Sequence, residues 1–232
     1  MAMPIEQDVR TLRQVEFLSP QYNITLIGYG NPTGLPQNVT WKPIQRSANR
    51  LRRLYEIALL ALGRVVPAAY DIYLSTRPHY RQTVRYATDS QANVYHACDW
   101  AAIALCAQAA KIHPAPIFFD GDEYWTLENE SSRSWRMVFA PLIRHTMNKY
   151  VGSIAAATTL SPPFVELYQK EYHLDTEIML CVPSYVEVPV RLTKPDHIVL
   201  MHHGAARRNR YLETMIEALS KLDSRFHLVF ML

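Results

Sequence analysis

Residues 93–120, NVYHACDWAAIALCAQAAKIHPAPIFFD, decide the fold of this chain. The run from Asn93 to Ala97 is typical of a strand, and Pro116 to Asp120 is an apolar run short enough for a buried strand. Between them, Asp99 to Lys111 is rich in alanine, the strongest helix former, so we expect a helix there. A strand, a helix and a second strand in this order predict a parallel β–α–β unit.

The same alternation extends from this unit in both directions. We expect helices at residues 8–18, 47–64, 67–85 (with a break), 132–150 and 162–172, and strands at 23–29, 152–157 and 178–182. Three prolines predict that residues 30–42 are irregular. The pattern is typical of an α/β protein whose first domain is a Rossmann-like, doubly wound parallel sheet.

A proline-containing segment divides the chain. We assign residues 1–185 to the first domain and residues 186–195, VEVPVRLTKP, to a linker. Residues 196–232 then repeat the pattern, with a strand at 197–202, a helix at 209–222 and a strand at 226–231. Because the chain ends after that strand, we expect this second Rossmann-like domain to be incomplete.

Composition excludes several classes of protein. Hydrophobic residues make up 49% and charged residues 19% of the chain, which is typical of a globular protein. The net charge of +3 and the lack of a recognition motif argue against a nucleic-acid partner. Cys98, Cys106 and Cys181 form neither a disulfide framework nor a zinc motif, so we expect free thiols and a cytoplasmic protein. No apolar run is long enough to predict a transmembrane helix.

The glycines at residues 28, 30 and 34 superficially suggest a dinucleotide-binding loop. Such a loop opens into a helix whose N-terminus holds the pyrophosphate. Here Pro32 and Pro36 follow instead, so we do not assign a dinucleotide site.

Acidic side chains follow the strand that ends at Asp120. Asp120, Asp122 and Glu123 lie where ligands bind in open α/β sheets. Such carboxylates act as general bases or bind a divalent metal ion. His96 and Asp99 end the preceding strand at the same edge, and Asp99 also suits the N-cap of the next helix. Purely structural roles, a loop cap and a satisfied histidine, remain the alternatives.

A second candidate site follows the first strand after the linker. Residues 202–210, HHGAARRNR, combine a small-residue turn with arginines before a helix, which favours binding of a diphosphate. The candidate residues are Gly204, Arg207 and Arg210. The alternative is that these arginines are simply solvated. His202 and His203 do not predict a metal site, because no third ligand lies near them in the sequence.

These segments together resemble the GT-B glycosyltransferases of the retaining family-four group. The resemblance is carried by VYHACDWAAIALCAQAAK, by FFDGDEYW, by GSIAAATTLSPPFVELYQKEYHLD, and by PSYVEVP with HHGAARRNRYLETMIEALSKLDSRFHLVFM. It implies two Rossmann-like domains facing across a cleft, with an acceptor bound by the first and a nucleotide-diphosphate sugar by the second. It also implies transfer to a glycan or lipid-linked acceptor without a catalytic metal or a separate cofactor.

The resemblance implies a role for each candidate residue. The implied catalytic residues are Asp120, Asp122 and Glu123. The implied acceptor-binding residues are His96 and Asp99. The implied residues that bind the donor diphosphate are Gly204, Arg207 and Arg210.

Two departures from the family keep alternatives open. Asp122 stands where many relatives carry histidine, and Ala205 replaces a common arginine. One alternative is therefore a non-catalytic carbohydrate- or partner-binding remnant of a glycosyltransferase. A separate alternative comes from the Asp-x-Asp pattern after an apolar strand, which also resembles the metal motif of GT-A-type transferases, here Asp120 and Asp122.

The helix expected at 47–64 predicts a further partner. Its beginning carries Arg46, Arg50, Arg52 and Arg53, although cations oppose the macrodipole at a helix N-terminus. Its apolar stripe comprises Leu51, Leu54, Tyr55, Ala58, Leu59 and Leu62. A basic helix of this kind is typical of peripheral contact with an anionic membrane, here its cytoplasmic face. A solvated basic surface is the alternative.

Overall fold

A computed structural model of the protein describes residues 4–45, 50–183, 185–189, 192–206 and 210–232. The chain divides into two compact units, residues 1–182 and 183–232. Every pair of strands that forms a ladder in the described residues is parallel. The chain is therefore an α/β protein with parallel sheets, as the alternation of strand and helix patterns predicted.

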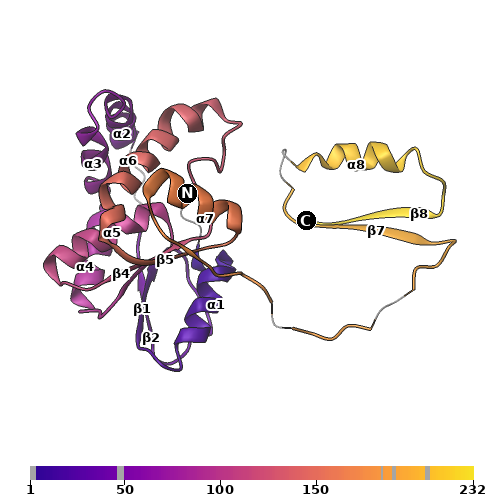
Figure 1. The fold of residues 1–232 in the computed structure, drawn as a ribbon, viewed down its shortest axis with the longest axis horizontal. Helices are drawn as coiled ribbons and strands as arrows, with labels where there is room; N and C mark the ends of the chain where they lie inside the picture. Colours follow the sequence, from indigo (N-terminus) through magenta and orange to yellow (C-terminus); the bar gives the residue numbers. More distant parts are fainter. Residues whose placement is uncertain (1–3, 46–49, 184, 190–191, 207–209) are drawn as a thin grey trace. The chain divides into compact units, whose positions relative to one another are not determined.

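The first unit holds two parallel sheets (Figure 1). The larger has the strand order β3 (Tyr95–Ala97), β4 (Ile117–Gly121), β5 (Ile154–Thr159) and β6 (Glu177–Ile178). The smaller pairs β1 (Ile24–Gly28) with β2 (Val39–Pro43). The predicted strands at 93–97 and 116–120 are thus confirmed as direct neighbours in one sheet.

Strand β2 corrects the expectation for residues 30–42. These residues were predicted to be irregular, but Val39 begins a strand that pairs with β1 in parallel. Val39, Thr40 and Trp41 are β-branched or aromatic and suit a pleated strand. Pro43 ends the strand, a position where proline is tolerated. Since β2 follows β1 with no helix between them, the glycine loop lacks the context of a dinucleotide site.

Helices cover the larger sheet. In chain order the α-helices of the first unit are α1 (Val9–Leu18), α2 (Arg50–Leu62), α3 (Ala68–Ser75), α4 (Pro78–Asp89), α5 (Trp100–Ile112), α6 (Ala140–Tyr150) and α7 (Pro162–Tyr172). The shorter helical segments are η1 (Ile5–Gln7), η2 (Trp135–Phe139, a π-helix) and η3 (Val151–Ser153). Helix α5 packs on β3 and β4, and its neighbours are α4 and α6. The small alanine side chains of α5 let this helix pack close to the sheet.

The main core lies between the larger sheet and these helices. Its fully buried side chains include Ile103 of α5, Ile117 and Phe119 of β4, Leu142, Ile143 and Met147 of α6, and Tyr168 of α7. A separate small cluster joins Ile5, Val15 and Leu26. Because β4 is central to the larger sheet and buried, the residues at its end are held in fixed positions.

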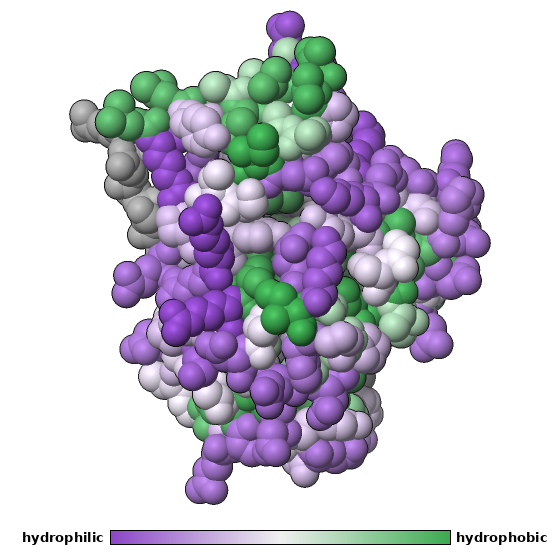
Figure 2. Space-filling model, turned by 90° about the vertical axis from the view of Figure 1, so that its left-hand side faces the viewer, coloured by the Kyte–Doolittle hydropathy of each residue, from purple (hydrophilic) through white to green (hydrophobic). Residues whose placement is uncertain are grey.

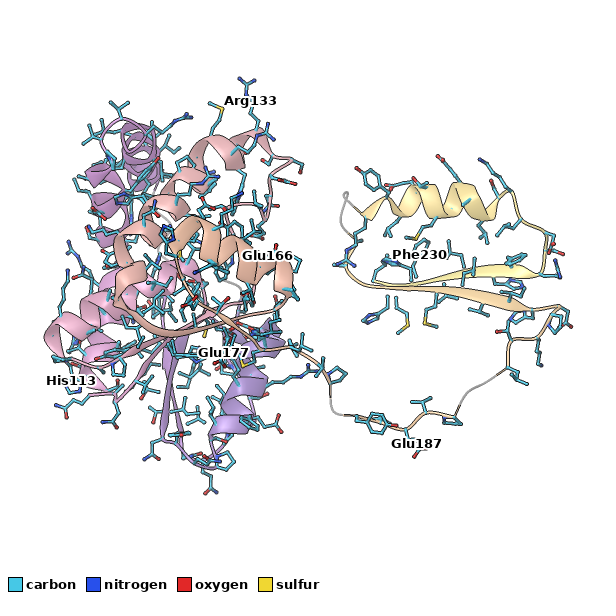
Figure 3. All side chains as sticks on the ribbon, viewed as in Figure 1. His113, Arg133, Glu166, Glu177, Glu187 and Phe230 are labelled. Carbon is cyan, nitrogen blue, oxygen red and sulfur yellow. The ribbon has the colours of Figure 1, made fainter. Side chains whose placement is uncertain are left out.

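The second unit consists of β7 (Ile198–His203), α8 (Leu212–Leu219) and β8 (Phe226–Met231). Its two strands pair in parallel, and alternate residues of β8 are half-buried. The side chain of Phe230 is one of these and points toward α8 (Figure 3). None of the described residues of this unit is buried. Two strands and one helix are too few to enclose a core.

Candidate functional site

The carboxyl edge of the larger sheet brings most of the acceptor-side candidates together. In the sheet register, His96 of β3 lies opposite Phe118 of β4, and Asp120 of β4 lies opposite Thr158 of β5. Asp99 and Asp122 follow β3 and β4 by one or two residues. These residues were predicted from the sequence to share one edge. The parallel pairing of β3, β4 and β5 places them there.

Asp120 is the most strongly bound carboxylate of this edge. Arg10 of α1 donates two hydrogen bonds to it, from Nε to Oδ2 and from Nη2 to Oδ1, each 2.6 Å long. Gln14 Nε2 donates to Oδ2 at 2.6 Å and the Thr158 hydroxyl donates to Oδ1 at 2.9 Å. With four donors on two oxygens, Asp120 has no acceptor position left for a metal ion or a substrate proton. It acts on the site by fixing α1 against β4.

These contacts also set the charge of the Asp120 side chain. Burial opposes its ionisation, but the hydrogen bonds from Arg10, Gln14 and Thr158 outweigh burial and hold its pKa below the ordinary value. The pair therefore stays ionised, and the pKa of Arg10 is raised by the hydrogen bond to Asp120.

Asp122 has the opposite electrostatic environment. Burial, followed by the charge of Asp120, raises its pKa from 3.8 to about 7. Its side chain is half-buried. A carboxyl group that titrates near neutral pH can exchange a proton with a substrate hydroxyl. Glu123, next in sequence, is exposed, and its carbonyl oxygen accepts a hydrogen bond from Tyr168 at 2.8 Å.

His96 lies on the same edge with one ring nitrogen unused. Its Nε2 atom is buried and has no hydrogen-bond partner among the described residues. The ring packs edge-on against Phe118 with a centroid separation of 4.8 Å. Burial lowers the pKa of His96, so the ring is neutral at neutral pH and Nε2 is available to a polar ligand.

Asp99 has a structural role that the sequence predicted. Its carboxylate accepts a hydrogen bond of 2.7 Å from the Ala102 amide and caps α5. Burial nevertheless raises its pKa. Cys98 beside it is a free thiol whose pKa is raised by burial. An acceptor-binding role of Asp99 therefore has to coexist with its role as a cap.

The second candidate site lies at the carboxyl edge of β7 and β8. Gly204 follows β7 with a φ of +145°, a region that favours glycine. A side chain at residue 204 would collide with Nη1 of Arg210, so the guanidinium lies directly against the Gly204 backbone. The Gly204 amide donates to the Met231 carbonyl at 3.0 Å and is not open to a phosphate. Arg207, the third predicted residue, lies outside the described residues.

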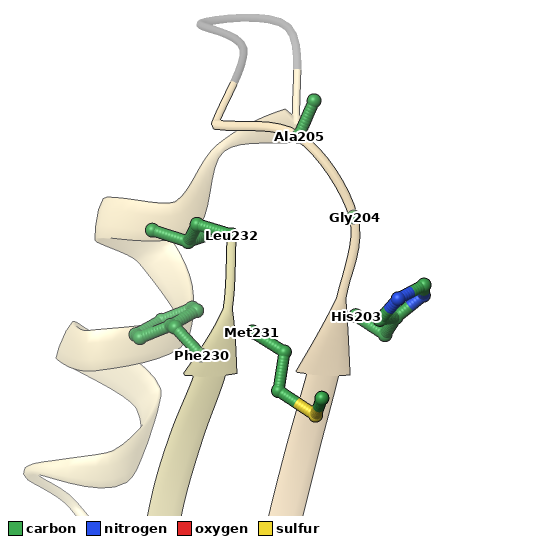
Figure 4. Close-up of a pocket in the computed structure, with 6 residues that line it drawn as sticks. All are labelled: His203, Gly204, Ala205, Phe230, Met231 and Leu232. Carbon is green, nitrogen blue, oxygen red and sulfur yellow. The ribbon is translucent and has the colours of Figure 1, made fainter. Parts of the chain in front are cut away.

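An open hollow lies beside this loop (Figure 4). It is lined by His203, Gly204, Ala205, Phe230, Met231 and Leu232. Close by, the Nε2 atom of His202 is buried and has no partner in the described part of the chain. The hollow is thus lined by apolar side chains of Phe230 and Met231 and by the turn at Gly204. The Arg210 guanidinium lies against this glycine.

The residues around Asp120 were missed by sequence reasoning. Arg10 and Gln14 are four residues apart and so lie on one face of α1, but this spacing alone does not show that the face is buried. No group of three or more His, Cys, Asp or Glu side chains among the described residues is placed to hold a metal ion. Among the same residues, no helix has the length and apolar character needed to cross a bilayer.

Comparison with known proteins adds no assignment. Neither a model of a known protein family nor a curated protein matches the sequence of this chain.

Proposed function

We propose that this chain belongs to a GT-B-type glycosyltransferase that moves a sugar from a nucleotide-diphosphate donor to a glycan or lipid-linked acceptor. The observation that carries the proposal is the contact of the Arg210 guanidinium with the Gly204 backbone at the carboxyl edge of β7. In open parallel sheets this edge is where nucleotides bind.

On the donor side, Arg210 would bind the diphosphate through charged hydrogen bonds. As the bond from the sugar to the diphosphate breaks, negative charge grows on the leaving oxygen, and a fixed guanidinium stabilises it. Helix α8 begins two residues later, and no side chain among the described residues caps its N-terminus. Its first amides add a partial positive charge near the same position.

On the acceptor side, Asp122 and His96 are the side chains that could transfer a proton or bind a hydroxyl group. Asp122 titrates near neutral pH and would accept the proton of the attacking hydroxyl. The unpartnered Nε2 of His96 would hydrogen-bond an acceptor hydroxyl. Asp120 would serve as a positioning residue that fixes the end of β4.

Two observations bear on the alternatives. The Gly204 amide is already bound to Met231 and Ala205 carries no charge, which favours a binding module with a weakened donor site. The four donors around Asp120 count against a GT-A-type metal site, because that site needs free carboxylate oxygens.

Calorimetric titration with UDP, GDP, ADP and CDP tests the proposal. We expect one of them to bind without a metal ion, and Arg210→Gln to weaken it at least about tenfold, since a hydrogen bond to a charged group contributes about 1.5–3 kcal/mol. Arg225→Gln is the matched control, because Arg225 precedes β8 at the opposite edge of the sheet. Binding that requires Mn²⁺ and is lost in Asp122→Asn would instead favour the GT-A alternative. Failure of all four nucleotides to bind would overturn the proposal.

A further inference from the structure

The apolar stripe of α2 faces away from the core. Leu54 is 66% and Leu62 is 51% exposed, and both belong to the apolar stripe predicted from the sequence. The side chains that α2 does bury include Leu59 and Leu60, at 7% and 8% exposed. Leu59 lies at the margin of the stripe and Leu60 on the other side of the helix. The helix therefore presents its most continuous apolar surface to the outside.

Specific contacts fix this orientation. Arg52 is turned inward, where Nε donates to Glu56 at 2.9 Å and Nη2 donates to the Thr76 carbonyl at 3.1 Å. At the end of the helix, Gly63 lies against the ring of Tyr70, in a space that a side chain would fill. Rotating the stripe into the core would break the hydrogen bond from Arg52 to Thr76 and the packing of Gly63 on Tyr70.

The exposed surface continues beyond α2. We define the α2–α3 apolar patch by its exposed large side chains, Leu51, Leu54, Tyr55, Ile57, Leu62, Val65, Val66 and Ile72. Figure 2 shows apolar side chains gathered at the top of this face, over the end of the first unit that holds α2 and α3. Contiguous apolar surface of this kind marks an interaction site.

The charges next to the patch are positive apart from Asp71, which neighbours Ile72 in the sequence and forms an ion pair with Lys149 at 2.7 Å. Arg53 and Arg64 are exposed at its border, and Nη1 of Arg64 donates to the Met137 carbonyl. Glu56 is the one acidic residue in the sequence of α2, and Arg52 neutralises it on the inward side. An apolar face bordered by arginines is the pattern of a helix that lies in the plane of a membrane interface.

We infer that the α2–α3 apolar patch docks on an anionic lipid surface, with the stripe inserted at the level of the headgroups and the arginines near lipid phosphates. This inference goes beyond the proposed function and does not depend on it. A symmetric dimer through the same patch is less favourable, because it would bring Arg53 and Arg64 close to their own copies. Lipid headgroups supply the opposite charge.

Sedimentation of the full chain with vesicles tests the inference. We expect binding to equimolar phosphatidylcholine and phosphatidylglycerol, and weak binding to phosphatidylcholine alone. Leu54→Gln should lower the partition coefficient at least about tenfold, since burying a leucine contributes about 1.5–3 kcal/mol. Arg53→Gln should lower it about fivefold, because a basic residue near an anionic surface contributes about 1 kcal/mol.

The controls distinguish binding through the α2–α3 apolar patch from nonspecific hydrophobic adsorption to vesicles. Phe17→Gln removes an even larger apolar side chain that is 79% exposed on α1, and it should leave vesicle binding unchanged. Circular dichroism confirms that each variant is folded. Equal binding to both kinds of vesicle, or binding that Leu54→Gln does not change, would overturn the inference. Self-association that Leu54→Gln abolishes, without vesicle binding, would assign the patch to a second copy and would also overturn it.

Discussion

The Arg10 guanidinium grips the Asp120 carboxylate with two hydrogen bonds of 2.6 Å, across 110 residues of sequence. The side chains are only 10% and 2% exposed. The pair ties α1 to the end of β4, the strand that leads into Asp122. The geometry of the carboxyl edge of the larger sheet therefore depends on a residue near the start of the described chain.

Removing one partner of this pair should destabilise the first unit strongly. We expect Arg10→Gln to lower the free energy of unfolding by about 3–5 kcal/mol, because it leaves a buried charge without its partner. All four tryptophans lie in the first unit, so urea unfolding followed by their fluorescence measures the effect. The control Arg85→Gln breaks an ion pair that is 80% and 64% exposed and should cost less than about 1 kcal/mol. Equal effects of the two substitutions would show that the buried pair is not a structural anchor.

Asp122 should make the first unit less stable as pH rises toward neutral. Its pKa is about 7 in the folded protein and 3.8 ordinarily, so the folded state binds more protons between these values. The contribution of Asp122 to the free energy of unfolding is fully present below the ordinary pKa of 3.8. It is lost as pH rises through the folded-state pKa of about 7. Asp122→Asn should therefore flatten the decrease in unfolding free energy between about pH 5 and about pH 7.5. An unchanged pH dependence in the variant would place the pKa of Asp122 near its ordinary value.

Much of this fold could be predicted from local sequence, but the long-range contacts could not. The strand–helix–strand run at 93–120 is confirmed because apolar runs and an alanine-rich segment specify it locally. Helix α7 was predicted with its observed bounds, since Pro162 suits a first helical position. The partners of Asp120 could not be found this way, because no local pattern encodes a contact across 110 residues.

The orientation of α2 shows a second limit of sequence patterns. An amphipathic stripe predicts which residues share a face, but not whether that face is covered. Here the hydrogen bond from Arg52 to the Thr76 carbonyl and the small Gly63 against Tyr70 place another face inward. For the loop after β7, the sequence predicts a glycine turn with cations. The hydrogen bond from the Gly204 amide to the Met231 carbonyl could be seen only from the strand pairing.

Two leucines of α2 provide a direct check of its orientation. Leu60→Ala should lower the free energy of unfolding by about 2–5 kcal/mol, because Leu60 is buried in the core. Leu54→Ala removes the same atoms from an exposed position and should change it by less than about 0.5 kcal/mol. Urea unfolding of both variants measures the difference. A larger loss in Leu54→Ala than in Leu60→Ala would mean that the stripe faces the core.

The contact at the end of α2 gives an independent check. Gly63→Ala would place a methyl group inside the ring of Tyr70, and such overpacking costs about 1–3 kcal/mol. Gly152→Ala is the matched control, since no described residue other than its chain neighbours has an atom within 4 Å of the added group. Thermal unfolding should show a lower midpoint for Gly63→Ala alone. Equal midpoints for the two variants would contradict the packing of α2 on α3.

The proposed nucleotide site after β7 is tested most directly by a ¹H–¹⁵N NMR titration of the full chain with the nucleoside diphosphate that calorimetry selects. We predict saturable shifts of the Gly204 and Ala205 amides, which lie beside the hollow. The shifts should be lost in Arg210→Gln and retained in Arg225→Gln. Shifts confined to Gly121 and Asp122, or no saturable shift in either unit, would contradict a donor site at the carboxyl edge of β7 and β8.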